Sequence, residues 1–558
     1  MSKSLAIFTI IIFSIEGYAQ EPVTVEDYQR AESFLSANTR SLILNANVSP
    51  NWLEDSRMWY RNTVKNGAEF IIVDPVKKTR KVAFDHQRIA DAISNKDTTY
   101  EALNLPFRSF KYIKNGRSIS FDIDNKTYTC NLRNYRCTSN DKEKAATGDS
   151  SPRARYLRER ARVLSPDGKQ AAFIRDYNLW VRDASSKKER QLTFDGVEEF
   201  GYATNNAGWT KGPGPVVLWS PDSKKIATFQ HDSRGVGEMY MVSTKSGHPE
   251  LSQWKYPLPG DSLIFRISRV IINVQSGSEE LTTVPEVVRL KMQPDQHRST
   301  SDDHIAGRGG KFLDVRWSKD AKTVAFVSSS RDHKEAQLRV ANAETGEVRD
   351  VMKEVQKTYF ESGDGFSNWH YLSETNEAIW FSERDNWGHL YLIDLKTGKI
   401  KNRITQGQWA VQQVRYVDRE NRKIYFSAGG KEDGDPYYWH YYSVNMDGTG
   451  LKLLTPEYAH HTVNFSPKFK YFVDSYSTPV TPPISVLRDM DGNLLVNLEK
   501  ADISQLIAAG WKPPTQTKTK ARDGVTDIYG LMYKPTNFDP NRKYPVLNPL
   551  YPGPQSGS

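Results

Sequence analysis

A repeated unit of about 50 residues limits what this chain can fold into more than any other feature of its sequence. Each copy begins with an aromatic or apolar residue and a turn of the Ser-Pro-Asp-Gly type. A short alternating strand, a polar turn, a second strand rich in Leu, Tyr and Val, and a Thr-Gly or Asp-Gly hairpin turn follow. Clear copies are LSPDGKQAAF from Leu164, WSPDSKKIATF from Trp219 and WSKDAKTVAF from Trp317. A series of such units, each forming one small antiparallel sheet, is typical of an all-β fold, the β-propeller.

The spacing of the copies predicts seven or eight sheets. The turns that open the recognisable copies begin at Ser165, Ser220, Ser318, Ser373, Asp418 and Ser466. The intervals between them are 55, 98, 55, 45 and 48 residues, so the interval of 98 indicates two periods. We therefore expect a degenerate copy between about 260 and 310, where LIFRISRVIINV supplies a strand. Strand pairs upstream, in AEFIIVDPVKKTRKVAF and FRSFKYIKNGRSISFDIDNKTYTCNL, complete the set, and two successive β-sandwiches would not explain one recurring turn.

The segments that flank the repeats predict additional parts. Residues 25–47 have helical spacing, so we expect a helical segment over 20–50 before a propeller over 51–501. Residues 502–558 change character and suggest a short helix, a two-stranded hairpin with an Asp-Gly turn, and a buried strand in YPVLNPLYPGP that runs into a Pro-Gly loop. We expect this last segment to belong to another domain.

The first 19 residues have the features of a signal peptide. Lys3 precedes an apolar run from Leu5 to Ile15, and the small residues Gly17 and Ala19 follow at the spacing that signal peptidase recognises. The run is too short to span a bilayer, and no cysteine follows it that could carry a lipid. We therefore expect export as a soluble protein, periplasmic or secreted, with no membrane span. A buried N-terminal helix is the alternative.

The sequence has two cysteines, Cys130 and Cys137, both within TYTCNLRNYRCTS. In an oxidising compartment they predict a disulfide across a tight hairpin, and two unpaired thiols are the alternative. Their spacing does not resemble that of a zinc site.

Neither the charge nor the motifs of the sequence indicate a nucleic acid, a metal or a cofactor. The net charge is +9, from 76 basic and 67 acidic residues, and the densest basic stretch, TKTKAR over 517–522, has no aromatic residues interleaved for stacking on bases. The strings H-E-x-x-H, C-x-x-C and D-x-D-x-D-G do not occur. His460 and His461 are neighbours, so in a strand they face opposite sides and are expected to be structural.

Two places in the sequence are candidates for chemistry. An α/β-hydrolase nucleophile needs a G-x-S-x-G elbow, which does not occur in the 558 residues, and in GPQSGS the spacing is wrong, so Ser556 is expected to be a loop residue. The neighbouring acids Glu198 and Glu199, in FDGVEEFGYATNNAGW, could hold a cationic amine such as a peptide N-terminus. From the residues alone, a solvated turn between two strands is the favoured explanation of this pair.

Several strings together resemble the dipeptidyl peptidase IV branch of the prolyl oligopeptidase family of serine peptidases. They are LSPDGKQAAF, WSPDSKKIATF, SERDNWGHLYLID, TQGQWAV and ARDGVTDIYGLMYKPTNFDPNRKYPVLNPLYPGPQ, of which the last is the most specific. The resemblance covers nearly all of the chain after the signal peptide. It implies an eight-bladed propeller that caps an α/β-hydrolase domain, and peptide substrates that reach the active site through the cavity between the two. It also implies a homodimer if the hydrolase domain is present.

For the catalytic residues, the resemblance implies that residues from 502 onward enter the hydrolase domain. The Ser, Asp and His of the triad would lie beyond Ser558, so this chain alone is expected to be inactive. In the family, the tyrosine of a Y-x-G-P loop donates to the oxyanion hole, and LYPGP places Tyr551 there. The alternative is a secreted, non-catalytic propeller that binds peptides or a partner protein.

For the substrate amine, the resemblance is partial. Dipeptidyl peptidase IV holds the amine with a paired glutamate that follows a D-W-x-Y type string. The match here is the run from Asp195 to Glu199, in which the acids Glu198 and Glu199 fit, Gly196 replaces the tryptophan, and the tyrosine is missing. This departure leaves open whether the specificity is strict dipeptide release or a related exo- or oligopeptidase specificity.

Overall fold

The computed structural model of the protein consists mainly of antiparallel β-sheets. It describes residues 23–141, 161–204, 214–275, 285–296, 314–332, 334–360 and 368–548, so the signal peptide expected over 1–19 lies outside the described residues. Within these ranges there are seven four-stranded sheets, one six-stranded sheet and two separate two-stranded hairpins. A succession of eight small antiparallel sheets is consistent with a β-propeller.

The first four sheets lie within residues 51–296. Sheet 1 consists of β1 (Asn51–Trp52), β2 (Met58–Val64), β3 (Gly67–Asp74) and β4 (Thr79–Val82). Sheet 2 consists of β5 (Lys111–Ile113), β6 (Ser118–Ile123), β7 (Lys126–Asn131) and β8 (Cys137–Asp141). Sheet 3 consists of β9 (Val163–Leu164), β10 (Gln170–Arg175), β11 (Asn178–Asp183) and β12 (Glu189–Gln191). Sheet 4 consists of β13 (Phe200–Tyr202), β14 (Leu218–Trp219), β15 (Lys225–Asp232), β18 (Arg266–Asn273), β19 (Val287–Arg289) and β20 (Asp295–Gln296).

The last four sheets lie within residues 315–500. Sheet 5 consists of β21 (Val315–Trp317), β22 (Thr323–Ser329), β23 (Glu335–Asn342) and β24 (Val348–Val355). Sheet 6 consists of β25 (His370–Leu372), β26 (Glu377–Ser382), β27 (His389–Asp394) and β28 (Ile400–Arg403). Sheet 7 consists of β29 (Ala410–Asp418), β30 (Lys423–Gly429), β31 (Trp439–Asn445) and β32 (Lys452–Leu453). Sheet 8 consists of β33 (His460–Phe465), β34 (Tyr471–Thr478), β35 (Thr481–Asp489) and β36 (Leu494–Lys500).

The serine that opens each clear repeat closes the turn that follows it, which in sheet 4 joins β14 to β15. In sheet 4, Ser220 Oγ donates to Asp222 Oδ1 at 2.6 Å and accepts from Lys225 N at 2.8 Å. Ser165 and Ser318 make the equivalent pairs of hydrogen bonds in sheets 3 and 5. The Ser-x-Asp pattern therefore recurs because the two side chains satisfy the same backbone turn in successive sheets.

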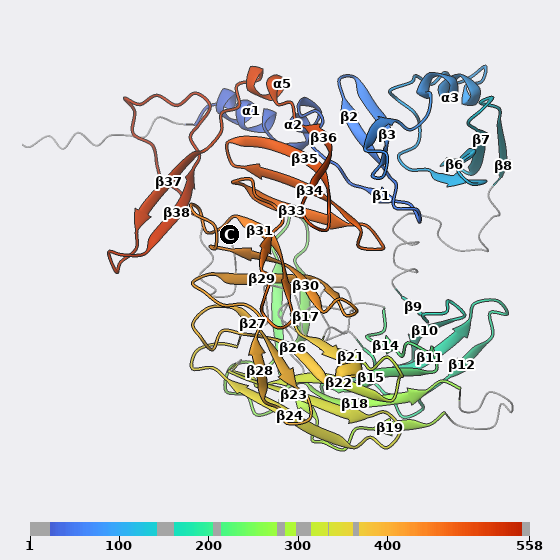
Figure 1. The fold of residues 1–558 in the computed structure, drawn as a ribbon, viewed down its shortest axis with the longest axis vertical. Coiled ribbons are helices and arrows are strands. Elements are labelled where there is room, and N and C mark those ends of the chain that lie inside the picture. Colours follow the sequence, from blue (N-terminus) through green and yellow to red (C-terminus); the bar gives the residue numbers. More distant parts are fainter. Residues whose placement is uncertain are drawn as a thin grey trace, which may run out of the picture.

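Buried apolar side chains form cores between neighbouring sheets, and one of them joins sheet 8 to sheet 1. Such cores join sheets 3 to 8 in order, then sheet 8 to sheet 1 and sheet 1 to sheet 2, and among the described residues no such core joins sheet 2 to sheet 3. In Figure 1 sheet 1, in blue, accordingly lies beside sheet 8, in orange. At this junction Met58 packs in one cluster with Leu487, while Glu499 accepts from Tyr60 Oη at 2.7 Å and forms an ion pair with Arg80. The first and last repeats are thus held together by both apolar and charged contacts.

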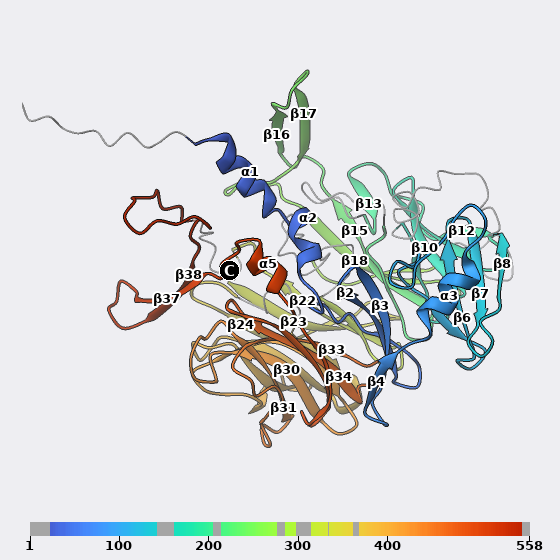
Figure 2. The same cartoon turned by 90° about the horizontal axis from the view of Figure 1, so that it is seen from above.

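The doubled interval in the sequence has a different origin from the one expected. β18 pairs with β15 over its whole length, from Arg266 opposite Asp232 to Asn273 opposite Lys225, so both strands belong to sheet 4. The additional length comes in part from β16 (Glu238–Ser243) and β17 (Glu250–Lys255), a separate hairpin that stands away from the ring in Figure 2. The expectation of a degenerate copy between 260 and 310 was wrong, because its strand completes a sheet after an insertion. The total is still eight, because the upstream strand pairs are parts of the four-stranded sheets 1 and 2.

Short helices lie outside the sheets. The segment expected to be helical contains α1 (Val25–Ser33), α2 (Ser36–Thr39) and η1 (Arg40–Leu42), and α1 begins after Thr24, whose side chain accepts from Asp27 N. The remaining helices described are α3 (His86–Ile93), η2 (Ser373–Thr375) and α5 (Ser504–Ala508). None of the helices in the described part of the chain is long and apolar enough to cross a membrane.

The C-terminal segment agrees with the sequence in its hairpin but not in its expected buried strand. β37 (Thr515–Lys520) and β38 (Asp527–Met532) form the hairpin predicted around the Asp-Gly turn. Residues 543–548 form no strand, and Val546 and Leu547 are each 89% exposed. An apolar stretch becomes a buried strand only where another layer covers it, and no described element covers this one. The hydrolase domain expected from 502 onward therefore remains a prediction.

Candidate functional site

Glu198 and Glu199 lie at the end of the ring where the chain enters each sheet. Because neighbouring strands alternate in direction, the loops between successive sheets share one end of the ring with the hairpins that join the second and third strands. The loop from β12 to β13 carries both glutamates, and the hairpin β16–β17 leaves sheet 4 at the same end. Residues 502–548 follow the last strand of sheet 8 and also start from this end. These segments, which are far apart in the sequence, therefore share one face of the molecule.

A buried asparagine fixes the beginning of the glutamate loop. Asn178 Oδ1 accepts from Gly196 N at 2.9 Å and from Thr193 Oγ1 at 3.0 Å, and its Nδ2 donates to Gly196 O at 3.0 Å. A Cβ atom on Gly196 would lie 2.3 Å from the carbonyl oxygen of Tyr177, closer than any side chain can approach. The loop therefore needs glycine at this position, where the family pattern has tryptophan.

A second polar cluster holds the loop against sheet 4. Arg289 Nη2 donates to Tyr202 Oη at 2.9 Å and to Gln230 Oε1 at 2.6 Å, and it lies 3.3 Å from Asp195 Oδ2. Tyr202 Oη donates to Asp195 Oδ1 at 2.8 Å. Burial, together with the hydrogen bond to Asp195, raises the pKa of Tyr202, so the phenol stays protonated and remains a donor. Asp195 is thus held in place three residues before Glu198.

The two candidate glutamates differ in their surroundings. Glu198 is exposed, and no ion pair or hydrogen bond of its carboxylate is found among the described residues. The side chain of Glu199 is 37% exposed, and its Oε1 lies 2.9 Å from Lys255 Nζ. Glu199 also has a left-handed backbone, with φ of 63°, and its carbonyl accepts from Ser233 N at 2.8 Å. Glu198 therefore presents an open carboxylate, whereas that of Glu199 already has a cationic partner.

The other residues singled out in the sequence fall into two groups. Cys130 and Cys137 lie opposite each other on β7 and β8, and the structure joins them in a disulfide. Tyr551 and Ser556, the proposed oxyanion donor and the serine of the final loop, lie outside the described residues, and so does the geometry of any oxyanion hole.

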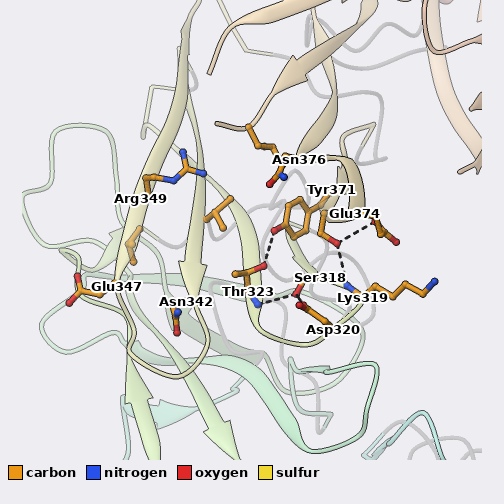
Figure 3. A pocket seen from close by; sticks show the side chains of 14 residues that line it. Ser318, Lys319, Asp320, Thr323, Asn342, Glu347, Arg349, Tyr371, Glu374 and Asn376 are labelled. Carbon is orange, nitrogen blue, oxygen red and sulfur yellow. Dashed lines mark hydrogen bonds between the residues drawn. The ribbon is translucent and has the colours of Figure 1, made fainter. Parts of the chain in front are cut away.

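Two cavities lie between sheets 4, 5 and 6. One of about 590 Å³ is at the same end of the ring as the glutamates, where Arg266, Arg331, Arg339 and Asp295 lie on its wall. The other, of about 670 Å³, lies at the opposite end, among the turns of sheets 5 and 6 (Figure 3). The cavity at the same end as the glutamates is thus rich in guanidinium groups, which suit carbonyl and carboxylate oxygens.

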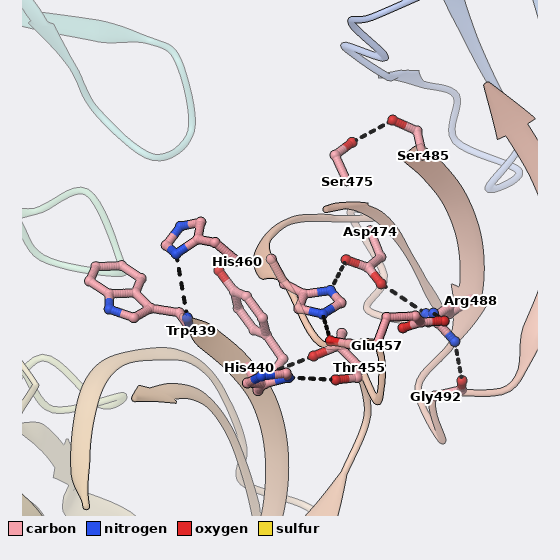
Figure 4. Close-up of polar contacts among 12 residues, drawn as sticks. Trp439, His440, Thr455, Glu457, His460, Asp474, Ser475, Ser485, Arg488 and Gly492 are labelled. Carbon is pink, nitrogen blue, oxygen red and sulfur yellow. Dashed lines mark hydrogen bonds and ion pairs between the residues drawn. The ribbon is translucent and has the colours of Figure 1, made fainter. Parts of the chain in front are cut away.

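A buried group of acids and a histidine in sheet 8 has the composition of a metal site. Ligand atoms of Glu457, His461 and Asp474 lie within 4.8 Å of one another. As Figure 4 shows, Arg488 already binds both carboxylates, with Nε donating to Asp474 Oδ2 at 3.0 Å and Nη2 to Glu457 Oε1 at 2.6 Å. A metal ion would have to replace this guanidinium, so we interpret the cluster as structural. His461 is fully buried while its neighbour His460 is only partly buried, as expected for adjacent residues on opposite faces of a strand.

Comparison with known proteins shows the family to which this chain belongs. The model of the family described as dipeptidyl peptidase IV (DPP IV) N-terminal region matches residues 122–483. The chain therefore belongs to this family, whose members are the propeller regions of dipeptidyl peptidases.

Individual relatives are distant in sequence. The dipeptidyl-aminopeptidase B of Aspergillus niger is 26% identical over 424 residues, which are 71% of this chain and 44% of that protein. The crystal structure of Porphyromonas gingivalis dipeptidyl peptidase 4 has a TM-score of 0.59 and 17% identity, and the match covers 91% of this chain and 67% of that one. This chain thus spans less than half the length of the curated relatives that it matches.

Sequence reasoning identified the two glutamates but missed the residues that position them. Asn178, Arg289 and Lys255 come from three different strands, at sequence distances that no local motif connects to the loop. The one available signal was Gly196, because a glycine at an otherwise aromatic position indicates a close backbone approach.

Proposed function

We propose that this chain is the propeller portion of an exported serine peptidase of the dipeptidyl peptidase type, in which it admits and positions peptide substrates. The observation that carries the proposal is the loop with Glu198 and Glu199, which Asn178 and Asp195 hold at the end of the ring where the C-terminal segment also starts. Membership of the family supports the reaction class, which the sequence motifs had already suggested.

The chemistry of the loop suits an N-terminal ammonium. An ammonium has three N–H donors and a positive charge, and neighbouring carboxylates can accept charge-assisted hydrogen bonds from it. A carboxylate pair on a fixed loop holds the amine at a constant distance from the rest of the peptide. Such an anchor would select peptides by their free N-terminus and so favour release of short N-terminal units.

The remaining parts of the proposal concern residues outside the described ranges. Tyr551 would donate to the oxyanion hole, and residues 1–19 would direct export to the periplasm or the medium. The catalytic triad itself would not be on this chain. Because the string G-x-S-x-G does not occur in the sequence, we expect no hydrolysis of dipeptide substrates by the 558-residue chain alone. The product of the complete gene, assayed on proline- and alanine-containing dipeptide substrates with free and blocked N-termini, tests the reaction class.

The role of the glutamates can be tested with the 558-residue chain itself. We expect Glu198→Gln to weaken binding of a free-amine peptide such as Ala-Pro-Ala amide about ten-fold, because a charged hydrogen-bond acceptor is lost, and to leave the N-acetylated peptide unaffected. Isothermal titration would give both dissociation constants. Glu420→Gln is the matched control, because Glu420 is an exposed acid in the turn between β29 and β30, at the opposite end of the ring. Equal affinity for free and acetylated peptides would contradict the proposal.

A further inference from the structure

The carboxylate of Glu199 is already bound by an ammonium group that belongs to the chain itself. Lys255 is the last residue of β17, and its Nζ lies 2.9 Å from Glu199 Oε1. The side chain of Lys255 is 23% exposed and that of Glu199 is 37% exposed, so the pair is partly screened from solvent. The contact joins the glutamate loop to the base of the hairpin that stands away from the ring in Figure 2.

The base of the hairpin is tied to the same loop by its backbone. Ser233, which follows β15 and leads into the hairpin, donates from N to the carbonyl of Glu199 at 2.8 Å. Tyr256 N donates to Gly237 O at 2.7 Å and closes the hairpin base beside Lys255. Lys255 is therefore presented to Glu199 by a fixed backbone.

The Lys255 ammonium has the same chemistry as the proposed ligand. A lysine side chain and a peptide N-terminus both end in a primary ammonium with three N–H donors, so both compete for the same carboxylate oxygens. We propose that Lys255 is a built-in competitor at Glu199, and that a peptide amine binds there by replacing it. This inference rests on the proposed function, because it takes Glu198 and Glu199 as the amine site.

The structure gives the displaced lysine a second partner. Glu238 lies opposite Lys255 in the β16–β17 register, and its Oε1 is 3.8 Å from Lys255 Nζ. Glu238 itself is oriented by Tyr240, whose Oη donates to Glu238 Oε2 at 2.8 Å. When a peptide amine binds Glu199, the Lys255 ammonium can move to Glu238. The exchange therefore leaves neither the lysine nor the Glu199 carboxylate without a partner.

This competition makes the site selective for ligands with a free ammonium. A peptide with a blocked N-terminus cannot pair with Glu199, and it therefore leaves Lys255 in place. A free-amine peptide binds Glu198 directly but must replace Lys255 to use Glu199. Competition from Lys255 thus lowers the affinity of the site for every amine that binds at Glu199.

The inference is tested by removing the competitor. We expect Lys255→Met to tighten binding of Ala-Pro-Ala amide about two- to five-fold, as expected from loss of a partly exposed ion pair, and to leave the N-acetylated peptide unchanged. Lys245→Met is the matched control, because Lys245 is an exposed lysine beyond β16 in the turn of the same hairpin. If Lys255→Met binds the free-amine peptide no better than the unmodified chain, Lys255 is not a competitor.

A double-mutant cycle separates competition from a general change in charge. In a Glu199→Gln background the Lys255→Met substitution is expected to have no effect, because the two residues act through one contact. An effect of equal size in both backgrounds, or in Lys245→Met, would indicate long-range electrostatics and overturn the inference. If Glu198→Gln and Glu199→Gln leave amine binding unchanged, or no binding of the free-amine peptide is measurable, the proposed function fails as well. If only Lys255→Met is without effect, the proposed function stands and this inference alone fails.

Discussion

At the scale of single residues, Gly196 shows how the glutamate loop of this chain differs from the family pattern. The carbonyl of Tyr177 leaves no room for a Cβ atom at this position, and Asn178 bonds both backbone polar groups of the glycine. A tryptophan cannot be accommodated unless the loop changes its path. The missing aromatic residue thus agrees with the path that the loop takes in this chain, in which Glu199 has a left-handed backbone.

His370 allows a prediction about acid stability at the same scale. Burial, and then the charges of Arg316 and Arg419, lower the pKa of His370 from 6.5 to about 3. Below pH 6.5 the unfolded chain gains a proton here that the folded chain does not, so stability contributed by neutral His370 falls as the pH decreases toward 3. Between pH 7 and pH 5 the free energy of unfolding of the unmodified chain should fall through this effect. We expect it to fall by about 1–2 kcal/mol less in His370→Asn, as measured by urea unfolding at both pH values. An identical loss in the variant would show that His370 titrates normally in the folded state.

At the scale of elements, the sequence predicted the repeats and the C-terminal hairpin well because their signals are local. A Ser-x-Asp turn fixes itself through hydrogen bonds over a few residues, as Ser220 shows, and the Asp-Gly turn between β37 and β38 is equally local. The assignment of β18 to a sheet of its own failed because strand pairing is not local. The hairpin β16–β17 separates β18 from its partner β15, and periodicity cannot distinguish such an insertion from another repeat.

The disulfide provides a prediction for a single sheet. Cys130 is fully buried in the core shared by sheets 1 and 2, and it is bonded to Cys137 on the neighbouring strand. Cross-linking a short loop limits the unfolded chain and contributes about 2–3 kcal/mol. We expect the double variant Cys130→Ala/Cys137→Ala to lose that much unfolding free energy, with the loss of hydrogen-exchange protection largest in β7 and β8. A variant as stable as the unmodified chain would show that the cross-link does not contribute.

At the scale of the whole molecule, the first and last sheets meet through contacts that local sequence patterns do not reveal. Tyr60 and Arg80 on sheet 1 meet Glu499 at the end of sheet 8, and Leu44 pairs with Asp502 just beyond it. The candidate site shows the same limitation, because Lys255 reaches Glu199 only through the hairpin. The sequence therefore predicted the sheets and singled out the two glutamates as candidates, whereas the junction of sheets 8 and 1 and the partner of Glu199 depend on contacts between residues that are far apart in the chain.

The C-terminal segment provides a prediction for the stability of the whole ring. Asp502 bridges to Leu44 and Leu506 is buried, whereas Val525 and Tyr533 are 76% and 73% exposed. A chain that ends at residue 512 should therefore keep a Tm close to that of the full chain and associate less, because it keeps the bridge, loses exposed apolar surface, and gives up only the hydrogen bonds from Gln516 to Tyr438 and from Tyr529 to Gly434. A chain that ends at residue 501 is the matched control, and it should unfold at a lower temperature because Leu44 loses its partner.

Calorimetry and light scattering on the three chains would distinguish the two functional hypotheses. If the full chain precipitates and the chain ending at 512 stays in solution, the result favours the portion of a larger peptidase, in which other residues cover this surface. A full chain that is monomeric and unfolds in one sharp transition favours the non-catalytic binding propeller. A Tm of the chain ending at 512 that is as low as that of the chain ending at 501 would contradict the prediction, because it would show that residues 513–558 stabilise the ring as much as the bridge does.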